Sequence, residues 1–154
     1  GHAEDLDSFV RHALTAYLAR IRREADCRAR RTALLATPVL TVPELACRRA
    51  ESTETTEQWM MPLRTNGRLI AIPDQPDLII PAFQITNHGG LVTVVAETNR
   101  ILTISRLYTL WTKWAWWHSR TGFLSGASPI DLIHTAPRRI ITAARRMTDP
   151  HGSG

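Results

Sequence analysis

The stretch TVPELACRRAESTETTEQWMMPLRTNG, residues 41–67, decides the fold that the sequence predicts. It opens with the signals of a helix start. Thr41 and Glu44 have the spacing of a capping box, in which each side chain accepts a hydrogen bond from a backbone amide of the other residue. Pro43 is tolerated in a first helical turn, where its missing N–H costs nothing. We therefore expect a short helix over residues 43–50.

A second short helix is expected after a turn. Ser52 and Thr53 are residue types that cap helix starts, and they predict a helix over 53–64. Asn66-Gly67 ends this helix, because glycine readily adopts the left-handed conformation. Ala50-Glu51-Ser52 stands where helix-turn-helix modules usually carry a glycine. The two helices and their tight turn still predict a helix-turn-helix module.

A small β-hairpin is predicted next. Residues 68–72 and 78–85 are extended runs rich in apolar residues, and a proline-containing turn over 73–77 separates them. Two short helices followed by a hairpin form the plan of a winged helix-turn-helix. In that plan the second helix enters the major groove of DNA, the first helix braces it, and the hairpin is the wing.

Outward from this module, on its N-terminal side, a long amphipathic helix is predicted over residues 5–31. Its apolar residues recur at helical spacing as far as Ile21, and arginines dominate after that point. An apolar stripe of this length suits dimerisation between two copies of the helix, so we expect a homodimer. The alternative is that the helix packs on its own domain.

The C-terminal side is predicted to be helical. Helices are expected over 91–102, 103–118 and 136–147, and a further helix opens at Ser128, where proline and aspartate follow the cap. The predicted fold class is therefore mainly α with a small β-hairpin: a winged helix-turn-helix-like module followed by a helical C-terminal domain. The expected domains are an N-terminal basic helix, the helix-turn-helix-like module and a partner-binding domain, over residues 3–36, 37–90 and 91–148.

Composition points to an acidic partner. The 154-residue chain has a formal net charge of +5, and Lys113 is its only lysine, so arginine supplies nearly all of the positive charge. Arginine forms bidentate contacts with phosphates, which makes DNA the first candidate. The alternative is a charge that only keeps the protein in solution. Cys27 and Cys47 have no zinc-site spacing, no secretory signal is present, and no apolar run can cross a membrane, so we expect a cytoplasmic protein.

No motif for catalysis is present. The sequence lacks GxxxxGK[ST], GxGxxG, HExxH and GxSxG, and its histidines lie far apart without metal-ligand spacing. The carboxylates cluster at helix starts, where capping explains them. His88, beside Gly89-Gly90, is the best isolated candidate for a site, although a histidine in a loop needs no function. We therefore expect a binding protein rather than an enzyme, with no cofactor and no metal.

The candidate DNA contacts are arginines, which can meet phosphates, and hydroxyl or amide side chains, which can meet base edges. They are Arg22, Arg23, Arg48, Arg49, Thr53, Thr55, Thr56, Gln58, Arg64 and Arg68. Glu51, Glu54 and Glu57 lie on or beside the same helix and repel phosphates, although a glutamate can also accept from cytosine. The alternative is a helix-turn-helix fold that serves only as a scaffold or as a surface for a partner.

The C-terminal half resembles a known family. IPAFQI, residues 80–85, resembles the P-A-F-Q-F element that follows the wing in one group of bacterial proteins. That group later has a tryptophan, a leucine-glycine and a Ser/Thr-Pro-hydrophobic-Asp-Leu run. Trp114 or Trp117, the segment 124–126 and SPIDLI, residues 128–133, resemble these elements. The chain is thus similar, over about residues 40–146, to the toxin-binding domain of the Xre/MbcA/ParS antitoxins, which partner RES-domain toxins.

The resemblance implies a mechanism. Antitoxins of this type resemble dimeric DNA-binding proteins whose C-terminal domain covers the NAD-degrading site of the toxin, and the complex represses its own promoter. The surface implied to face the toxin consists of Trp114, Trp117, Leu124, Pro129, Asp131, Ile133, Arg138 and Arg139. The alternative for the tryptophans and the proline is core packing. One exposed tryptophan would be a good interface anchor, and Trp116 lies off the stripe formed by Trp114 and Trp117.

Three functions remain open at this point. The first is a DNA-binding regulator of the antitoxin type that sequesters a RES-like toxin and represses its own promoter. The second is a stand-alone bacterial or phage transcription regulator with the same fold. The third is a protein–protein adaptor on a degenerate helix-turn-helix scaffold. The arginines of the first helix and of the tail favour the first two functions, and the glutamates of the helix over 53–64 favour the third.

Overall fold

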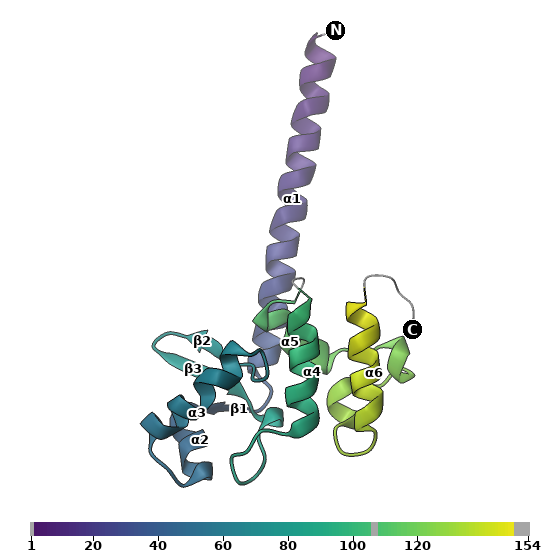
Figure 1. Cartoon of the computed structure of the whole chain (residues 1–154). Helices are drawn as coiled ribbons and strands as arrows, with labels where there is room; N and C mark the ends of the chain where they lie inside the picture. The colour runs from purple at the N-terminus through teal and green to yellow at the C-terminus, as the bar shows by residue number, and fades with distance from the viewer. Residues whose placement is uncertain (1, 106–107, 150–154) are drawn as a thin grey trace. The chain divides into compact units, whose positions relative to one another are not determined.

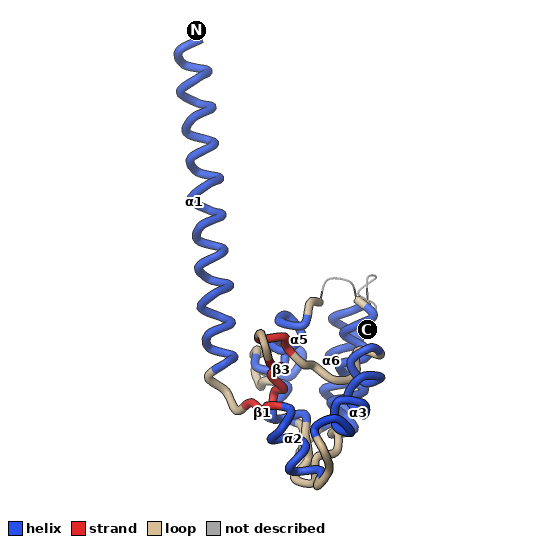
Figure 2. The backbone as a smooth tube through the Cα atoms, turned by 90° about the vertical axis from the view of Figure 1, so that its left-hand side faces the viewer, coloured by secondary structure: helices blue, strands red, loops and turns tan. Residues whose placement is uncertain are grey.

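The computed structural model describes residues 2–105 and 108–149, and the chain divides into two compact units after Ala36 (Figure 1). Unit 1 ends at Ala36 and unit 2 begins at Thr37. Unit 1 is one continuous helix, α1 (His2–Leu35), drawn as a single blue tube in Figure 2. This helix is longer at both ends than the predicted 5–31, because nothing in the sequence interrupts it before Thr37-Pro38.

Unit 2 opens with the strand β1 (Val39–Thr41) and the helix α2 (Val42–Arg49). The predicted capping box is present: Thr41 Oγ1 accepts from the Glu44 amide at 3.3 Å, and Glu44 Oε1 accepts from the Thr41 amide at 3.2 Å. Ala50 ends α2 in the left-handed conformation, with φ +54°. Alanine here takes the conformation that glycine usually supplies, so the missing glycine does not remove the turn.

The helix α3 (Thr53–Thr65) follows this turn. Ser52 caps its start as predicted, since its side chain accepts from the Thr55 amide at 3.1 Å. Thr56 and Met60 lie on its buried side, and α2 packs against it. Asn66 closes the helix, and Gly67 adopts a positive φ of +72°. The two short helices therefore form close to their predicted bounds, because their caps are local signals.

The sheet differs from the predicted hairpin. The strands β2 (Ile72–Asp74) and β3 (Asp77–Pro81) do form an antiparallel hairpin, but β1 also pairs with β3, giving a three-stranded sheet in the order β1-β3-β2. Residues 68–71, predicted as strand, precede the ladder. Ile70 is held instead by the side chain of Gln84, which binds both its backbone N–H and its C=O at 2.8 Å.

The C-terminal part of unit 2 contains α4 (Thr93–Ile104), α5 (Leu110–His118), α6 (Pro137–Thr148) and the short 3-10 turns η1 (Ala82–Gln84), η2 (Gly122–Leu124) and η3 (Pro129–Leu132). Two predictions were wrong here. The helix expected over 103–118 is divided, because α4 extends to Ile104 and a new helix begins after Thr109. Thr109 caps the new helix, since its side chain accepts from the Thr112 amide at 3.2 Å. The helix expected from Ser128 is only a 3-10 turn, in which Ser128 Oγ binds Asp131 at 2.7 Å.

Unit 2 spans the predicted boundary between residues 90 and 91. One apolar cluster, around Leu45, Met60 and Ile80, fills the space between α2, α3 and the sheet. Further fully buried residues, including Trp114 and Ile140, lie on α5 and α6, and Trp117 of α5 contacts Phe83 with ring centroids 5.1 Å apart. The segments expected as separate domains over 37–90 and 91–148 therefore belong to one compact unit, whereas the boundary expected after residue 36 coincides with the division of the chain.

The fold is mainly helical with a small three-stranded antiparallel sheet. In Figure 1, α2 and α3 lie on one side of unit 2 and α6 on the other, with α4 between them. The helices α4 and α6 pack along each other. No helix within residues 2–105 and 108–149 combines the length and the apolar character that a membrane span needs.

Candidate nucleic-acid interface

The exposed face of α3 carries most of the predicted base contacts. Thr53, Thr55 and Gln58 are exposed, and so are Glu54 and Glu57. The prediction for Thr56 was wrong, because its side chain is fully buried and faces the core of unit 2. The exposed face therefore offers one amide and two hydroxyls to a partner, beside two carboxylates.

Arg49 is predicted as a phosphate contact, but the structure engages its side chain within unit 2. Its guanidinium lies over the Trp59 ring, 3.8 Å from the ring centroid, forms an ion pair with Glu51, and donates to the Gly89 carbonyl at 2.8 Å. These contacts join the end of α2, the following turn, α3 and the loop over 86–90. Arg49 is thus a positioning residue for α3, and its ion pair offsets the charge of Glu51, one of the three glutamates that oppose DNA binding.

Gly89 makes room for this arginine. It adopts a positive φ of +82°, and a Cβ atom at this position would lie 2.1 Å from Arg49 Cγ. Any side chain here would therefore displace Arg49 or the loop. The close approach explains Gly89, while His88, the isolated site candidate beside it, is exposed.

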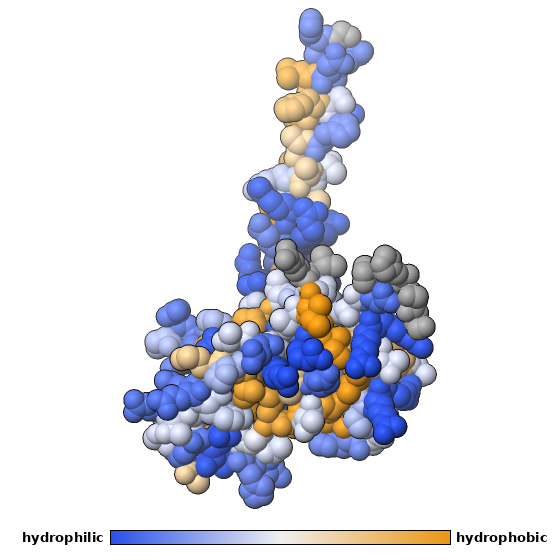
Figure 3. Space-filling view, in the orientation of Figure 1, coloured by the Kyte–Doolittle hydropathy of each residue, from blue (hydrophilic) through white to orange (hydrophobic). Residues whose placement is uncertain are grey.

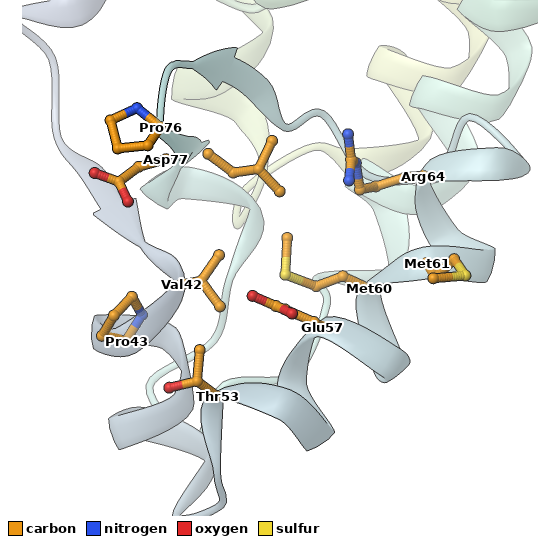
Figure 4. Close-up of a pocket in the computed structure, with 10 residues that line it drawn as sticks. Val42, Pro43, Thr53, Glu57, Met60, Met61, Arg64, Pro76 and Asp77 are labelled. Atoms are coloured by element: carbon orange, nitrogen blue, oxygen red, sulfur yellow. The ribbon is translucent and has the colours of Figure 1, made fainter.

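A groove of about 430 Å³ separates α2 and α3 from the hairpin (Figure 4). Val42, Met60 and Leu78 give it an apolar floor. Glu57 and Asp77 are exposed carboxylates that line it from opposite sides. Thr53 and Arg64, two of the candidate DNA contacts, line the same groove, so one arginine offsets part of the repulsion that the carboxylates exert on phosphates. Gln58 is not among the residues that line the groove.

The other predicted arginines occupy different environments. Arg48 lies in the last turn of α2 and Arg64 in the last turn of α3, and both are exposed. Arg48 also donates to the Thr86 carbonyl at 3.5 Å, a long bond to a neutral group, so its charge stays available to phosphates. Arg68 is half-buried. Arg22 and Arg23 are exposed on α1 in unit 1. The structure thus places Arg48 and Arg64 in one unit with Thr53, Thr55 and Gln58, and it leaves Arg22 and Arg23 on a separate unit.

A buried polar network fixes the α2–α3 module to the C-terminal helices. Gln84, fully buried, binds Ile70 and accepts from Asn99 Nδ2 at 3.2 Å. Asn99 in turn donates to the Arg68 carbonyl at 3.0 Å and accepts from Trp117 Nε1 at 2.8 Å. Sequence reasoning did not identify these residues as partners, although the PAFQ element contains the glutamine. A glutamine in an otherwise apolar run was the available signal.

The residues predicted to face a toxin are mostly core residues. Trp114, Trp117, Leu124, Pro129 and Ile133 are all buried in unit 2. Trp116, which lies off the Trp114–Trp117 stripe, is also buried, because elements pack against α5 from more than one side. The core-packing alternative therefore describes these side chains, and they offer no exposed anchor. Asp131, Arg138 and Arg139 of the same predicted surface are exposed.

The exposed side of α6 forms a basic face. We use this term for four arginines that project from one helix whose opposite side buries Ile140, Ala143 and Ala144. They are Arg138, Arg139, Arg145 and Arg146. Phe123, nearly half exposed, lines a shallow groove of about 260 Å³ beside three of them. Arg139 donates to Ser125 Oγ at 3.4 Å, a long bond to a neutral group, so its charge stays available to an acidic partner.

Two ionisable side chains are perturbed by burial. Burial lowers the pKa of Lys113, whose Nζ donates to Thr103 Oγ1 at 2.9 Å. Burial also lowers the pKa of His118, and the Asp131 carboxylate opposes that shift. Both lie on α5. In the part of the chain that the structure describes, no three His, Cys, Asp or Glu side chains gather as a metal site would require.

Comparison with known proteins adds one likeness. No protein-family model matches the chain, and no curated protein matches it. Among solved structures, the NMR structure of Rv2175c is similar, with a TM-score of 0.60 and 21% sequence identity, covering 74% of this chain and 83% of that chain. At this level of identity the likeness extends to the fold alone.

Proposed function

We propose that unit 2 is a DNA-binding regulator, in which α2, α3 and the β2–β3 hairpin act as a winged helix-turn-helix. The observation that carries this proposal is the way α3 is presented. Its Thr55 and Gln58 side chains point to solvent, while Arg49 ties the turn before it to the loop over 86–90. A rigidly braced helix with exposed polar side chains suits insertion into a major groove.

In this proposal some exposed side chains contact bases and others contact phosphates. Gln58 is the residue type that reads adenine through two hydrogen bonds, and Thr53 and Thr55 reach either base edges or phosphates. Arg48 and Arg64 supply phosphate contacts on either side of them. Glu54 and Glu57 weaken the attraction of this face for DNA, and their presence is the observation that favours the adaptor function instead.

The test is fluorescence anisotropy with a random-sequence duplex at about 50 mM salt, where phosphate contacts dominate binding. The Arg48→Ala/Arg64→Ala variant should bind more weakly, and its salt slope should fall by about 2, one unit for each phosphate that the variant can no longer neutralise. The matched control is Arg138→Ala/Arg139→Ala, which removes the same charge from the other side of unit 2.

The comparison of the two variants decides which face binds DNA. Weaker binding by Arg48→Ala/Arg64→Ala alone supports the α3 face. Weaker binding by the control alone would move the DNA site to α6 and contradict the proposal. Failure of the wild-type protein to bind any duplex at this salt concentration would leave the adaptor function as the better description of the α2–α3 module.

A protein partner is proposed for the basic face of α6, and this is the part of the antitoxin function that the exposed residues still support. The basic face lies on the other side of unit 2 from α3, so a partner there leaves α3 free for DNA (Figure 1). We expect a RES-domain protein from the native host to co-purify with the wild-type chain. Arg138→Glu/Arg139→Glu should abolish its capture, whereas Arg48→Ala/Arg64→Ala should retain it. Capture of the RES-domain protein by both variants as efficiently as by the wild type would contradict this assignment.

A further inference from the structure

The N-terminal half of α1 exposes a continuous apolar face. Seven large hydrophobic side chains recur on it at helical spacing, and each is between 42% and 70% exposed. They are Leu6, Phe9, Val10, Leu14, Tyr17, Leu18 and Ile21. Figure 3 shows an orange and tan band along one side of the upper part of α1, with hydrophilic residues beside it. A single helix in water gains free energy by covering such a face, so the face indicates a binding surface.

We propose that the same face of a second copy of this chain covers it, with the two α1 helices running antiparallel. The apolar face is centred between Ala13 and Leu14. Two helices related by a twofold axis at that point bring Leu6 of one copy opposite Ile21 of the other, and Val10 opposite Tyr17. Ala13, small and central, lets the two backbones approach closely. This inference does not depend on DNA binding.

Charge decides between the antiparallel and parallel arrangements. The start of α1 is acidic, with Asp5 and Asp7, and the residues at the other end of the apolar face are basic, with Arg20, Arg22 and Arg23. An antiparallel pair sets the acidic start of each copy beside the arginines of the other. A parallel pair in register sets like charges together at both ends, which destabilises a helix pair.

The positions around the helix agree with this pairing. At 100° per residue, Arg22 borders the apolar face on one side, and Asp7 lies near that edge, between Leu14 and Leu18. Asp5 and Arg23 lie beyond the other edge. In an antiparallel pair the same border of each helix meets, so each acid meets an arginine. Asp7 already binds Arg11 of its own helix at 2.9 Å, but both side chains are mostly exposed, and such a pair rearranges at little cost.

The length of the face also fits a dimer of two chains. Beyond Ile21 the same side of α1 carries Glu24 and Arg28, which a parallel pair would place in its seam. An antiparallel pair centred at Ala13 and Leu14 leaves both outside the apolar contact. The seven side chains together offer on the order of 700 Å² per copy, taking roughly 150–250 Å² for a fully exposed aromatic residue, close to the ~800 Å² per partner of standard stable interfaces.

The first experiment measures the mass of the full chain in solution by light scattering after size exclusion. We expect twice the mass of one chain. Leu14→Glu, at the centre of the face, should give the single-chain mass, because two carboxylates would be buried against each other. Thr15→Glu is the matched control: it adds the same charge to the opposite side of α1 and should stay dimeric.

The second experiment determines the direction of the helices by disulfide cross-linking, without DNA. Cys27 and Cys47, both exposed, are first replaced by serine. Ala3→Cys and Ala25→Cys are then made in separate chains, one of them carrying a tag that shifts its mobility. The antiparallel pair brings these two positions together, so the mixture should yield a tagged–untagged covalent dimer. Ala3→Cys alone should yield little, since its two copies lie roughly 32 Å apart at 1.5 Å per residue.

Other occupants of the apolar face give other results. A single-chain mass at all concentrations would mean that the face docks on its own unit 2 or stays open, and it would overturn the proposal. Efficient cross-linking of Ala3→Cys with itself would show a parallel pair and overturn the direction. A mass above two chains would replace the dimer with a larger helical bundle. Equal dimerisation by Leu14→Glu and wild type would place the dimer interface outside α1.

Discussion

At the scale of single residues, the buried side chain of Gln84 connects several segments of unit 2 by hydrogen bonds. Its amide satisfies both backbone groups of Ile70, accepts from Asn99 and donates to the Pro81 carbonyl at 3.2 Å. The segment over 68–71 has no strand partner, so this side chain supplies the hydrogen bonds that a strand would supply. Buried polar groups of this kind are costly to leave unpaired.

Replacing Gln84 by methionine should therefore destabilise unit 2 strongly. The volume stays nearly the same, but the Ile70 amide and carbonyl and the Asn99 amide are left without this partner. We expect the free energy of unfolding in urea to fall by roughly 3 kcal/mol or more. Gln58→Met on the exposed face of α3 is the matched control and should change it by less than about 0.5 kcal/mol. Similar effects of both substitutions would contradict the role given to Gln84.

His118 should make the stability depend on pH. Burial lowers the pKa of His118 below its ordinary value of 6.5, while its Nε2 has no hydrogen-bond partner among the described residues. Below about pH 6.5 the unfolded chain takes up a proton that the folded chain resists, so stability falls as the solution is acidified. This decrease continues down to the lowered pKa of the folded state.

The measurement is the melting temperature between pH 7.5 and 5. His118→Gln removes the titrating group, so its melting temperature should fall less over this range than that of the wild type. His134→Gln, at an exposed position, should follow the wild type. A steeper fall for His118→Gln than for the wild type would mean that the protonated imidazole stabilises the fold, in conflict with its burial.

At the scale of elements, the turn between α2 and α3 depends on a neighbour that is distant in sequence. The turn lacks a glycine, and Arg49 holds it through Gly89 and Trp59. The loop over 86–90 is therefore part of what positions α3. This dependence explains Gly89, whose missing side chain lets Arg49 approach the loop.

Gly89→Ala should disturb this arrangement. The added Cβ would meet Arg49 Cγ at 2.1 Å, and alanine resists the positive φ. We expect a decrease of about 1–3 kcal/mol in the free energy of unfolding, together with weaker DNA binding if α3 reads DNA. Gly122→Ala is the control, because its Cβ would meet nothing within 4 Å. An effect of Gly122→Ala as large as that of Gly89→Ala would rule out the close approach as the cause.

Neutralising the two exposed glutamates of α3 should show whether this helix contacts DNA. In Glu54→Gln/Glu57→Gln both exposed carboxylates become neutral amides of the same shape. If α3 faces DNA, affinity at low salt should rise by about fivefold for each carboxylate near a phosphate, from a repulsion of ~1 kcal/mol at 4 Å in water. Unchanged affinity in anisotropy measurements would mean that α3 does not contact the duplex. The double substitution lies outside the core, so it leaves the fold intact.

At the scale of the whole molecule, unit 2 is one compact unit. The helices α4 and α6 pack together, and the network of Gln84, Asn99 and Trp117 joins them and α5 to the sheet side. A chain that begins at Thr37 should therefore fold and melt in one cooperative transition by circular dichroism. Deleting residues 137–154 should abolish that transition, because α6 contributes Ile140, Ala143 and Ala144 to the core. Two separate transitions in the chain that begins at Thr37 would instead restore the two domains predicted over 37–90 and 91–148.

The sequence by itself determined the elements whose signals are local. The caps of α2 and α3 follow from residues within a few positions of one another, and so they were predictable. The hairpin turn was also placed correctly, but its first strand was predicted over 68–72 instead of 72–74, and α1 extends beyond the predicted 5–31 at both ends. The exposed site residues of α3 followed from the helix they lie on. The buried position of Thr56 did not, because it depends on which side of α3 packs against the core.

Only the tertiary structure decided the long-range contacts. Three of these contacts join segments that are distant in sequence: the pairing of β1 with β3, the Gln84 network and the Arg49–Gly89 contact. The largest separation is 42 residues, between Val39 and Pro81. The burial of Trp114, Trp116 and Trp117 depends in turn on elements that pack on several sides of α5. Local propensity carries no information about which distant partner a side chain meets. The predicted toxin-facing tryptophans became core residues for that reason: an aromatic stripe marks a face to be buried, and the fold determines what buries it.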